Sequence, residues 1–499
     1  MSLLSSNDSN VDHQQITISG ETPNPDDVTN NEPPRVLGLL PLIAILYFAS
    51  SGGPFGIEGA IASGPPVYVL LTFILVPFLW GYPIGMITAE LASLVGKNGG
   101  CSIWAEKAFG EHVSFSVGLF SFFAATVDLS LYPVLFVTYL ATLFTGTRYE
   151  HSKWGGQIAN QLETSYILAL VIIILIVLVN IWGAEQVGNF STVLSVILLL
   201  PFVILVCIGL WHVKLKEILS GEGGFKGRQE LQMGTLIVTV AWSSCGIDAG
   251  GQIAGEVKNA KRNYPLAVII VLLITSISYI LPILVGMQYD RDWENWQDGQ
   301  FSDIAYRVGG EWLNIFMSIG GMASSIGLFQ CNLCTVSRNL YSLSSRGYIP
   351  KIFSKLTPKR GTPWVGIIFV GTIVALLILM PFQSILNLDM SIYGFVAMSE
   401  CLTYLKLYFF NKDLERPFKA VTSPFGLPLM AAPMLFTVLI IVFSPHDIQW
   451  KTAVAVGINF SIVGIRYLYQ RYKAKRKIRS EYLDYESESL IKKFSINSD

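Results

Sequence analysis

Long apolar runs with almost no charge recur along the whole chain. One of them, SYILALVIIILIVLVNIWG, occupies residues 165–183. An apolar run of about 18 residues or more is typical of a helix that crosses a lipid bilayer. The pattern predicts an all-α integral membrane protein with twelve spanning helices. The predicted helices begin near Val36, Val67, Phe115, Ser165, Ser191, Thr235, Ala267, Trp312, Trp364, Leu388, Leu427 and Thr452.

Polar segments flank this apolar region at both ends. Residues 1–35 are rich in Asn, Asp, Ser and Pro and lack a basic start followed by an apolar core, so they are typical of a disordered tail rather than a signal peptide. Residues 36–470 hold the twelve predicted spans as one membrane domain. Residues 471–499 form a short, basic C-terminal tail. An even number of spans places both tails on the same side of the membrane.

The charge distribution indicates which side that is. The chain is 52% hydrophobic and only 14% charged, which excludes an ordinary soluble protein. Most of the 34 Lys and Arg residues fall in the tails and in loops on the same side as the tails, and basic loops face the cytoplasm. We therefore expect both termini in the cytoplasm and the plasma membrane as location, with endosomal or vacuolar membranes as alternatives. A net charge of −1 gives no reason to expect a nucleic-acid partner.

The cysteines predict neither a disulfide framework nor a metal site. Cys331 and Cys334 have the spacing of a zinc knuckle, but no second pair or histidine cluster accompanies them. Small residues of this kind commonly pack between membrane helices. No nucleophile, base and orienting group recur at a usable spacing, and no cofactor motif is present, so we expect neither an enzyme nor a bound cofactor.

Two of the predicted spans are interrupted by glycine at matching positions. The first span contains SSGGPFGIEG, residues 50–59, and the sixth contains SSCGIDAGGQIAGE, residues 243–256. Such breaks persist in a membrane only where protein or a wet cavity surrounds them. Either segment alone is explained by close helix packing. Matched breaks in the first members of two consecutive five-helix units, each holding an acid (Glu58 and Asp248), point instead to the central site of an inverted-repeat transporter.

Together with further motifs, these features resemble the amino acid, polyamine and organocation transporters. The motifs are TAELASLVGKNGG at residues 88–100, AGEVKNAKRNYP at 254–265, SLSSRGYIPKIF and GTPWV within 342–365, and LERPFKA at 414–420. The resemblance covers about residues 36–470. It implies a LeuT-like fold of ten core helices plus two, built as a 5+5 inverted repeat in which helices 1 and 6 are discontinuous.

Within that superfamily the chain is most similar to the plant and protist polyamine transporters. This narrower resemblance is carried by GGPFGIE in the first span, VDLSLYPVLF in the third and SECLTYLKLYF in the tenth. The chain departs from the plant pattern at Gln330 and Asn332, where the resemblance implies acids. It departs again at Gly246 and Ile247, where the resemblance implies an aromatic residue.

Acidic residues inside the predicted spans are the main candidates for chemistry. Six fall within spans or at their inner ends, and Asp389 is assigned to the outer rim. Two of the six, Glu90 and Glu256, lie near cytoplasmic ends and, together with the basic residue Arg338, are interpreted as gate or structural residues. The other four acids are Glu58, Asp128, Asp248 and Glu400. Each acid near a helix centre costs about 2.5–3.5 kcal/mol, so we expect a positive partner, and no span Lys or Arg lies near enough to supply one.

Aromatic residues share helix faces with these acids. Asp128 and Tyr132 are four residues apart, just before the kink expected at Pro133, and Tyr393 lies seven residues before Glu400. Aromatic rings beside carboxylates suit an alkylammonium ligand, although ordinary packing explains each ring taken singly, and Trp242 is equally well explained as bulky filler. The predicted substrate-binding residues are Gly53, Phe55, Gly56, Glu58, Asp128, Tyr132, Trp242, Gly246, Asp248, Tyr393 and Glu400.

These acids favour a polycationic substrate. A flexible polyamine needs several spaced acids, whereas an amino-acid zwitterion needs one anion site and one cation site, and Glu58 would repel its carboxylate. We expect an importer of polyamines such as putrescine or spermidine that works by alternating access, with the lipid bilayer as its surroundings. Proton cotransport is compatible with this scheme but not required by it, and Glu58 and Asp248 are the candidate proton carriers. The alternatives are a cationic or neutral amino-acid transporter and a receptor that has kept the transporter fold.

Overall fold

The computed structural model describes residues 35, 37–97, 99–145, 162–220, 231–358 and 361–496. Within these ranges the chain is helical, and its single β feature is an isolated bridge between Leu37 and Val257. The all-α class predicted from the apolar runs is therefore confirmed. The predicted N-terminal tail, residues 1–35, lies outside the described ranges except for Arg35.

Eight helical stretches in the described residues are long and apolar enough to cross a membrane. They are Pro66–Val95, Glu111–Leu143, Glu163–Trp182, Ala260–Tyr289, Glu311–Ser345, Phe382–Phe410, Pro424–Phe443 and His446–Lys473. Two shorter apolar helices, Val196–His212 and Trp364–Leu377, accompany them. These stretches support a multi-pass integral membrane protein. The count of twelve spans and the 5+5 repeat stay predictions.

The individual helices divide these stretches further. In chain order they are α1 (Leu39–Ser50), α2 (Glu58–Ile61), α3 (Pro66–Val76), η2 (Pro77–Gly81), α4 (Tyr82–Val95), α5 (Gly100–Phe109), α6 (Glu111–Leu129), α7 (Leu131–Thr145), α9 (Leu162–Trp182), α10 (Ala184–Gly209), η3 (Leu210–His212), α11 (Leu215–Ser220), α12 (Met233–Trp242), η4 (Ile247–Glu256), α13 (Ala260–Tyr289), η5 (Trp293–Asn295), α14 (Gln300–Gly309), α15 (Glu311–Ser345), η6 (Lys351–Ser354), α16 (Trp364–Leu377), α17 (Phe382–Phe410), η7 (Pro424–Gly426), α18 (Leu427–Phe443) and α19 (His446–Ile496). The predicted domain boundary at residue 470 falls inside α19.

Both predicted helix interruptions are present. The first separates α1 from α2, and the second separates α12 from the 3-10 helix η4. Gly246, at the second interruption, has a φ of +84°, and a Cβ there would lie 2.2 Å from the carbonyl oxygen of Ala49 in α1. The two interrupted helices approach each other so closely that only glycine fits at this point.

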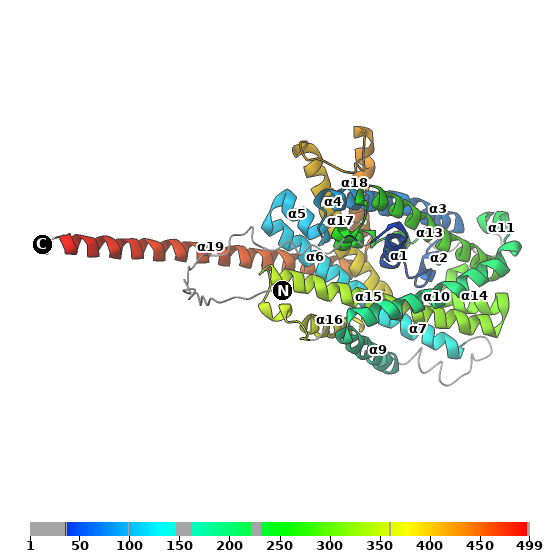
Figure 1. The fold of residues 1–499 in the computed structure, drawn as a ribbon. Helices are drawn as coiled ribbons and strands as arrows, with labels where there is room; N and C mark the ends of the chain where they lie inside the picture. The colour runs from blue at the N-terminus through cyan, green and yellow to red at the C-terminus, as the bar shows by residue number, and fades with distance from the viewer. Residues whose placement is uncertain are drawn as a thin grey trace, which may run out of the picture.

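The helices form one bundle whose two ends differ (Figure 1). α5 lies at one end, and α11 and α14 lie at the other, so we call these the α5 end and the α14 end. α15 packs against α6, α7, α9 and α10, and α17 packs against α6, α12 and α18. α19 projects beyond the α5 end (Figure 1). The cavity described below lies among these packed helices.

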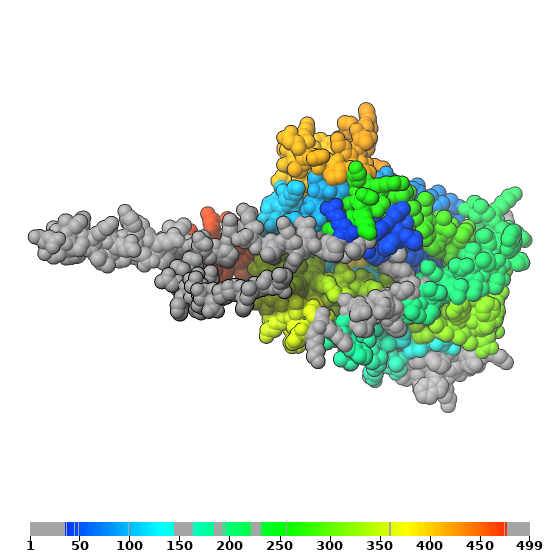
Figure 2. Space-filling view, viewed as in Figure 1, coloured from blue at the N-terminus to red at the C-terminus, as the bar shows by residue number. Residues whose placement is uncertain are grey.

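Apolar side chains cover much of the outside of the bundle. Examples with large exposed fractions are Leu71, Ile174, Leu178, Val203, Ile277, Leu376, Val442 and Ile465. An apolar exterior on long helices is what a bilayer requires, because lipid tails offer no hydrogen-bonding groups. Figure 2 shows one face of the molecule, where the blue surface of α1 lies beside the green surface of η4 and α13, the helices it packs against.

Candidate functional site

A cavity lies between the two helix interruptions. It encloses about 1130 Å³ when the part open to solvent is counted. The first interruption lines it with Ser51, Gly52 and Gly53, and side chains from α6, α7, α15 and α17 complete the wall. The lining includes eight of the predicted substrate-binding residues, namely Gly53, Phe55, Asp128, Tyr132, Trp242, Gly246, Asp248 and Tyr393. The sequence pattern thus pointed to residues that surround one cavity.

Asp128 is held by two aromatic side chains. The Tyr132 hydroxyl donates a hydrogen bond to Oδ2 (2.5 Å), and the indole Nε1–H of Trp242 donates one to Oδ1 (3.0 Å). The first bond confirms that Asp128 and Tyr132 share a face. α6 ends at Leu129, one residue after Asp128, and α7 starts at Leu131, because Pro133 has no N–H to continue the helical hydrogen bonds. The helix break therefore brings Asp128 to the cavity.

Asp248 is fixed in a similar way by Tyr393. The hydroxyl of Tyr393, on α17, donates a hydrogen bond to Oδ1 of Asp248 at 2.6 Å. The same hydroxyl accepts a hydrogen bond from the backbone N–H of Gly246 at 3.5 Å. The second interruption and α17 are joined through this tyrosine, so an acid from one helix and an aromatic ring from another are held together at the cavity wall.

A third carboxylate in the cavity was wrongly assigned by the sequence reasoning. Asp389 lies in the cavity lining and is buried, whereas the hydropathy pattern placed it at the outer rim. The predicted span began at Leu388, but α17 begins at Phe382, so Asp389 sits two turns inside the helix. It precedes Tyr393 by four residues and therefore shares its helix face. That spacing was the available signal for finding it.

The described residues that line the cavity include acids but no base. Asp128, Asp248 and Asp389 are among them, and none is a Lys, Arg or His. From α15 the lining takes two amides, Asn332 and Asn339, and the Nδ2 of Asn332 donates to the Tyr132 hydroxyl at 3.3 Å. Gln330, the other departure on α15, is fully buried and is not part of the lining. The wall is therefore built to receive positive charge.

The cavity is closed at the α14 end by packed aromatic rings. Phe55 packs edge-on against Tyr139 and Phe202, with ring centroids 4.8 and 4.6 Å apart, respectively. Trp242 meets Phe382 edge-on at 6.2 Å. In the opposite direction the lining runs along α15 as far as Asn339. The described conformation is closed toward α14 and extends toward the α5 end.

Glu58, Gly56 and Glu400 do not line this cavity. Glu58 begins α2 and is fully buried, and its Oε1 accepts hydrogen bonds from the Tyr139 hydroxyl (2.5 Å) and the N–H of Gly299 (3.2 Å). Gly56 faces Leu135 and Phe382 instead. These residues were expected to face the substrate, and the packing of α2 against the aromatic rings separates Glu58 from the cavity.

Glu400 is also buried, and neither of its carboxylate oxygens has a hydrogen-bond partner among the described residues. It lies two turns beyond Tyr393 on α17, toward the α5 end. A carboxylate in this position is stable only with a proton or a cation that the protein itself does not supply. Its placement keeps it as a candidate, but behind the wall of the cavity rather than in it.

The three residues predicted to act at gates differ in their surroundings. Glu90 accepts hydrogen bonds from Arg416 Nη1 (2.6 Å) and from the backbone N–H of Ala420 (2.7 Å), both in the LERPFKA motif. Arg338 is exposed and donates to the carbonyl oxygen of Cys334 at 2.8 Å. The side chain of Glu256 lies outside the described part of the chain.

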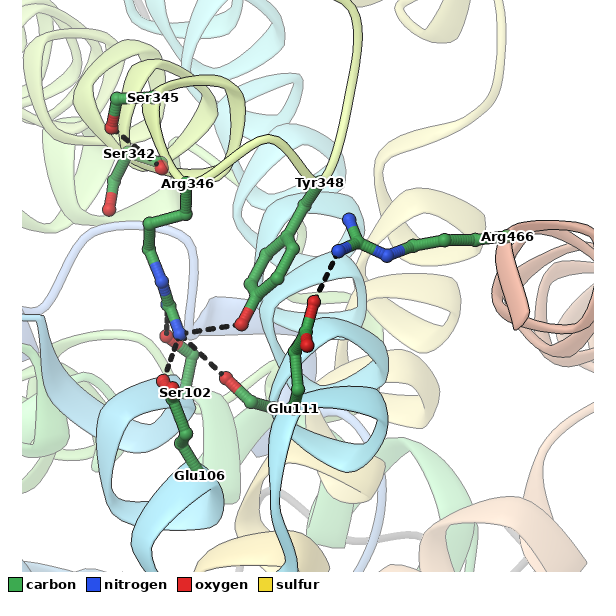
Figure 3. A network of polar contacts seen from close by, with 9 residues as sticks. Ser102, Glu106, Glu111, Ser342, Ser345, Arg346, Tyr348 and Arg466 are labelled. Atoms are coloured by element: carbon green, nitrogen blue, oxygen red, sulfur yellow. Dashed lines mark hydrogen bonds and ion pairs between the residues drawn. The ribbon is translucent and has the colours of Figure 1, made fainter. Parts of the chain in front are cut away.

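At the α5 end the SLSSRGYIPKIF motif forms a polar network (Figure 3). Arg346 pairs with Glu106 of α5 and donates to the hydroxyls of Ser114 (3.0 Å) and Tyr348 (2.9 Å). Arg466 of α19 pairs with Glu111 at the start of α6. Both guanidinium groups also lie over the ring of Tyr348. The acids here have basic partners supplied by the fold.

Comparison with known proteins finds relatives that are named as membrane transporters. The profile of the amino acid permease family, described as "Amino acid permease", matches residues 37–466. The chain is 30% identical to "Polyamine transporter RMV1" of Arabidopsis thaliana over 80% of this chain and 78% of the relative. It is 29% identical to "Polyamine transporter PUT1" of Oryza sativa subsp. japonica over 80% and 72%. It is 24% identical to the "Aspartate-proton symporter" of Bacillus subtilis over 84% and 77%.

Proposed function

Because the chain belongs to the amino acid permease family, we propose that it is a secondary transporter and that its substrates are polyamines such as putrescine and spermidine. One observation carries the proposal: three carboxylates line a single cavity, and none of the described residues that line it is basic. An acid inside a membrane protein needs a partner. In this cavity the partner is the travelling substrate.

The number and spacing of the acids favour a polyamine over an amino acid. Asp128 comes from the third predicted span, Asp248 from the sixth and Asp389 from the tenth, so the negative charges surround the cavity rather than meeting at one point. A di- or triamine carries charges spaced along a flexible chain and pairs with several acids at once. An amino-acid zwitterion brings a carboxylate that these acids would repel. The printed names of the two plant relatives agree with this assignment.

The membrane potential is a sufficient driving force for uptake. We assign the α5 end to the cytoplasm, because most of the 34 Lys and Arg residues lie in the tails and in the loops on that side. Moving one positive charge across 100 mV yields about 2.3 kcal/mol, so a divalent amine gains about 4.6 kcal/mol on entering a cell that is negative inside. The proposed location is the plasma membrane.

Alternating access follows from the two interrupted helices. In the described conformation the aromatic contacts of Phe55 and Trp242 close the α14 end, and the cavity extends toward the α5 end. We assign this conformation to the inward-facing half of the cycle. Rocking of the first, second, sixth and seventh predicted spans against the others would open the α14 end, as in transporters built from repeated halves.

Amino-acid transport is the second candidate. The name of the Bacillus subtilis relative specifies aspartate, and the α15 wall offers the amide of Asn332 rather than an acid. An amide donates to a carboxylate as readily as it accepts from an amine. This candidate predicts that arginine, leucine or aspartate displaces the substrate.

Uptake competition separates the two candidates. The purified protein is reconstituted into liposomes, and an inside-negative potential is imposed across their membrane. Uptake of radiolabelled spermidine is then measured with unlabelled putrescine, arginine, leucine or aspartate as competitor. Competition by putrescine alone supports the proposal. Competition by an amino acid, or spermidine uptake that ignores the potential, contradicts it. Asp248→Asn should lose uptake, whereas Asp447→Asn, an exposed acid paired with Lys451, should not.

A further inference from the structure

Glu58 is a fully buried acid that lies outside the proposed cavity. None of its side chain is exposed. Oε1 has two donors, the Tyr139 hydroxyl and the Gly299 N–H, whereas Oε2 is buried and has no hydrogen-bond partner among the described residues. A carboxylate oxygen left unpaired in the interior is strongly unfavourable. The site is therefore incomplete without a further ligand at Oε2.

Among the residues that the structure describes, the groups that face Glu58 include another acid and no base. Asp298, in the loop before α14, is close enough to interact electrostatically with Glu58, as are Tyr139 of α7 and Tyr279 of α13. α3 and α12, which pack against α2, contain no charged residue. The two arginines described at this end pair elsewhere, Arg291 with Glu217 and Arg307 with Asp290. None of the described bases is therefore shown to pair with Glu58, and we take the missing ligand to be a cation from solution.

We propose that Glu58 and Asp298 together bind one proton, and that this proton holds the loop before α14 against α2. The proton lies on Oε2 of Glu58 and is donated toward the carboxylate of Asp298, while Oε1 keeps its two donors. Two carboxylates that share a site in this way do not both ionise, because their charges repel strongly at low dielectric. Without the proton the loop is pushed away from α2.

The backbone at Gly299 is shaped for this contact. Gly299 has a φ of +95°, and a Cβ at this position would lie 3.0 Å from Cγ2 of Thr142 on α7. A glycine is the residue that tolerates this φ and this approach, and it lets the loop present its N–H to Oε1. The loop therefore docks on α2 and α7 through one backbone donor, and the charge state of the acid pair decides whether the docking is stable.

Access to the proton follows from the exposure of Asp298. This side chain is only partly buried, so it exchanges protons with solution at the α14 end. Glu58 lies deeper, behind the same aromatic rings that close the cavity. The proton and the amine thus occupy separate sites on either side of Phe55. Coupling between them runs through opening and closing of the α14 end, not through direct contact.

This inference rests on the proposed transport function for its physiological meaning, because a proton that closes the α14 end controls access to the cavity. The proton itself is detected without transport. Infrared difference spectra of the protein in lipid nanodiscs, recorded as a pH titration, report the C=O stretch of protonated carboxylic acids. At neutral pH we expect a C=O band from protonated carboxylic acids. The intensity of this band should fall by the equivalent of one carboxylic acid in Glu58→Gln. It should not change in Glu294→Gln, which replaces another acid of the segment before α14.

Asp298→Asn keeps the inference testable if Glu58→Gln does not fold. It removes the second charge, so the Glu58 band should remain but disappear at a lower pH than in the unsubstituted protein. A band that Glu58→Gln leaves unaltered, or a titration that Asp298→Asn does not move, overturns the proposal. A titration that shifts when sodium replaces a large organic cation at constant pH identifies a metal cation at the site and also overturns it.

A transport measurement supplies the link to function. At a clamped potential, spermidine uptake into liposomes should respond to the pH on the α14 side, and the response should be lost in Glu58→Gln and retained in Glu294→Gln. A pH response that survives in Glu58→Gln rejects the coupling. If no form of the protein transports spermidine, the polyamine proposal fails, and the infrared titration still decides whether Glu58 and Asp298 bind a proton.

Discussion

The acids at the α5 end and the acids in the cavity have the same chemistry and opposite surroundings. Glu90, Glu106 and Glu111 each pair with an arginine. Asp128 and Asp248 instead receive hydrogen bonds from tyrosine and tryptophan, and no described residue that lines their cavity is basic. The fold supplies positive charge where acids connect helices and withholds it where they surround a space. The difference identifies which acids await a ligand.

The comparison is sharpest for Glu90, because its ion pair is buried. The side chains of Glu90 and Arg416 are only 2% and 8% exposed, and the two residues lie far apart in sequence. The buried charge of Glu90 is therefore compensated within the fold. Without Arg416, Glu90 would be a buried carboxylate that lacks a basic partner, as Asp389 is.

The largest effect should follow from removing that arginine. Arg416→Ala leaves Glu90 buried with only the N–H of Ala420 as donor, and breaking a buried pair in this way destabilises a protein by about 3–5 kcal/mol. The unfolding temperature of the protein in nanodiscs should fall steeply. Arg338→Ala is the matched control, since Arg338 is exposed and bonds a backbone carbonyl. Equal unfolding temperatures for the two variants would remove the distinction between the two regions.

The next largest effect should be on ligand binding in the cavity. Asp248→Asn keeps the shape of the side chain and its bond from Tyr393 but removes the negative charge. Loss of one charge partner of an amine should weaken spermidine binding about ten- to hundredfold, or about 1.4–2.8 kcal/mol. Isothermal titration calorimetry measures this directly. Glu106→Gln at the α5 end should leave the affinity unchanged, and an equal loss there would show that the effect is not local.

Much of this arrangement could be predicted from the sequence, because it depends on local patterns. Glycine and proline inside apolar runs marked both interruptions, and the four-residue spacing of Asp128 and Tyr132 placed them on one face. The apolar runs also predicted an all-α membrane fold. Each of these signals lies within a few residues of the feature it predicts.

The errors have physical causes of two kinds. Asp389 was excluded because Gln383, Asn387 and Asp389 make the start of α17 look too polar for a span, yet these side chains face protein rather than lipid. The partners of Glu58 are a different case. Tyr139 and Gly299 are distant in sequence, so no local pattern joins them to Glu58, and only the folded chain brings them together.

Replacing Asp389 should have a smaller effect on protein stability than replacing Arg416, and an effect of opposite sign. Asp389 and Asp128 lie close enough to repel each other electrostatically, so Asp389→Asn should stabilise the protein in the absence of spermidine, by about 0.5–2 kcal/mol, the usual range for a stabilising substitution. The same variant should gain less stability from added spermidine. Unfolding temperatures with and without spermidine measure both changes. Glu90→Gln, by contrast, should destabilise the protein under both conditions.

If Asp389→Asn lowers the unfolding temperature of the ligand-free protein as Glu90→Gln does, then the cavity acids are already compensated. The comparison between the two regions would then fail. The paired result, stabilisation in the cavity and destabilisation at the α5 end, depends on the missing counter-charge and on no other property of the two acids.

The smallest expected effect concerns how the stability of the protein depends on pH through two acids outside the spans, Asp298 and Glu217. Burial raises the pKa of Asp298 to about 6, above the unfolded value of about 3.9. The folded protein therefore binds more protons than the unfolded chain between these two pH values. The contribution of Asp298 to the free energy of unfolding is fully present below about pH 4 and is lost as the pH rises through about 6. Asp298→Asn should abolish that decline.

Glu217 provides the opposite sign, because hydrogen bonds from Arg291 and then from Lys214 lower its pKa. Its contribution is lost as the pH falls, and Glu217→Gln should flatten that decline instead. Unfolding temperatures between pH 3 and 7 distinguish the two, because the decline due to Glu217 lies below its unfolded pKa of about 4.3 and the decline due to Asp298 lies above about pH 4. Slopes of the same sign would mean that the presence of an arginine does not decide how an acid of this protein behaves.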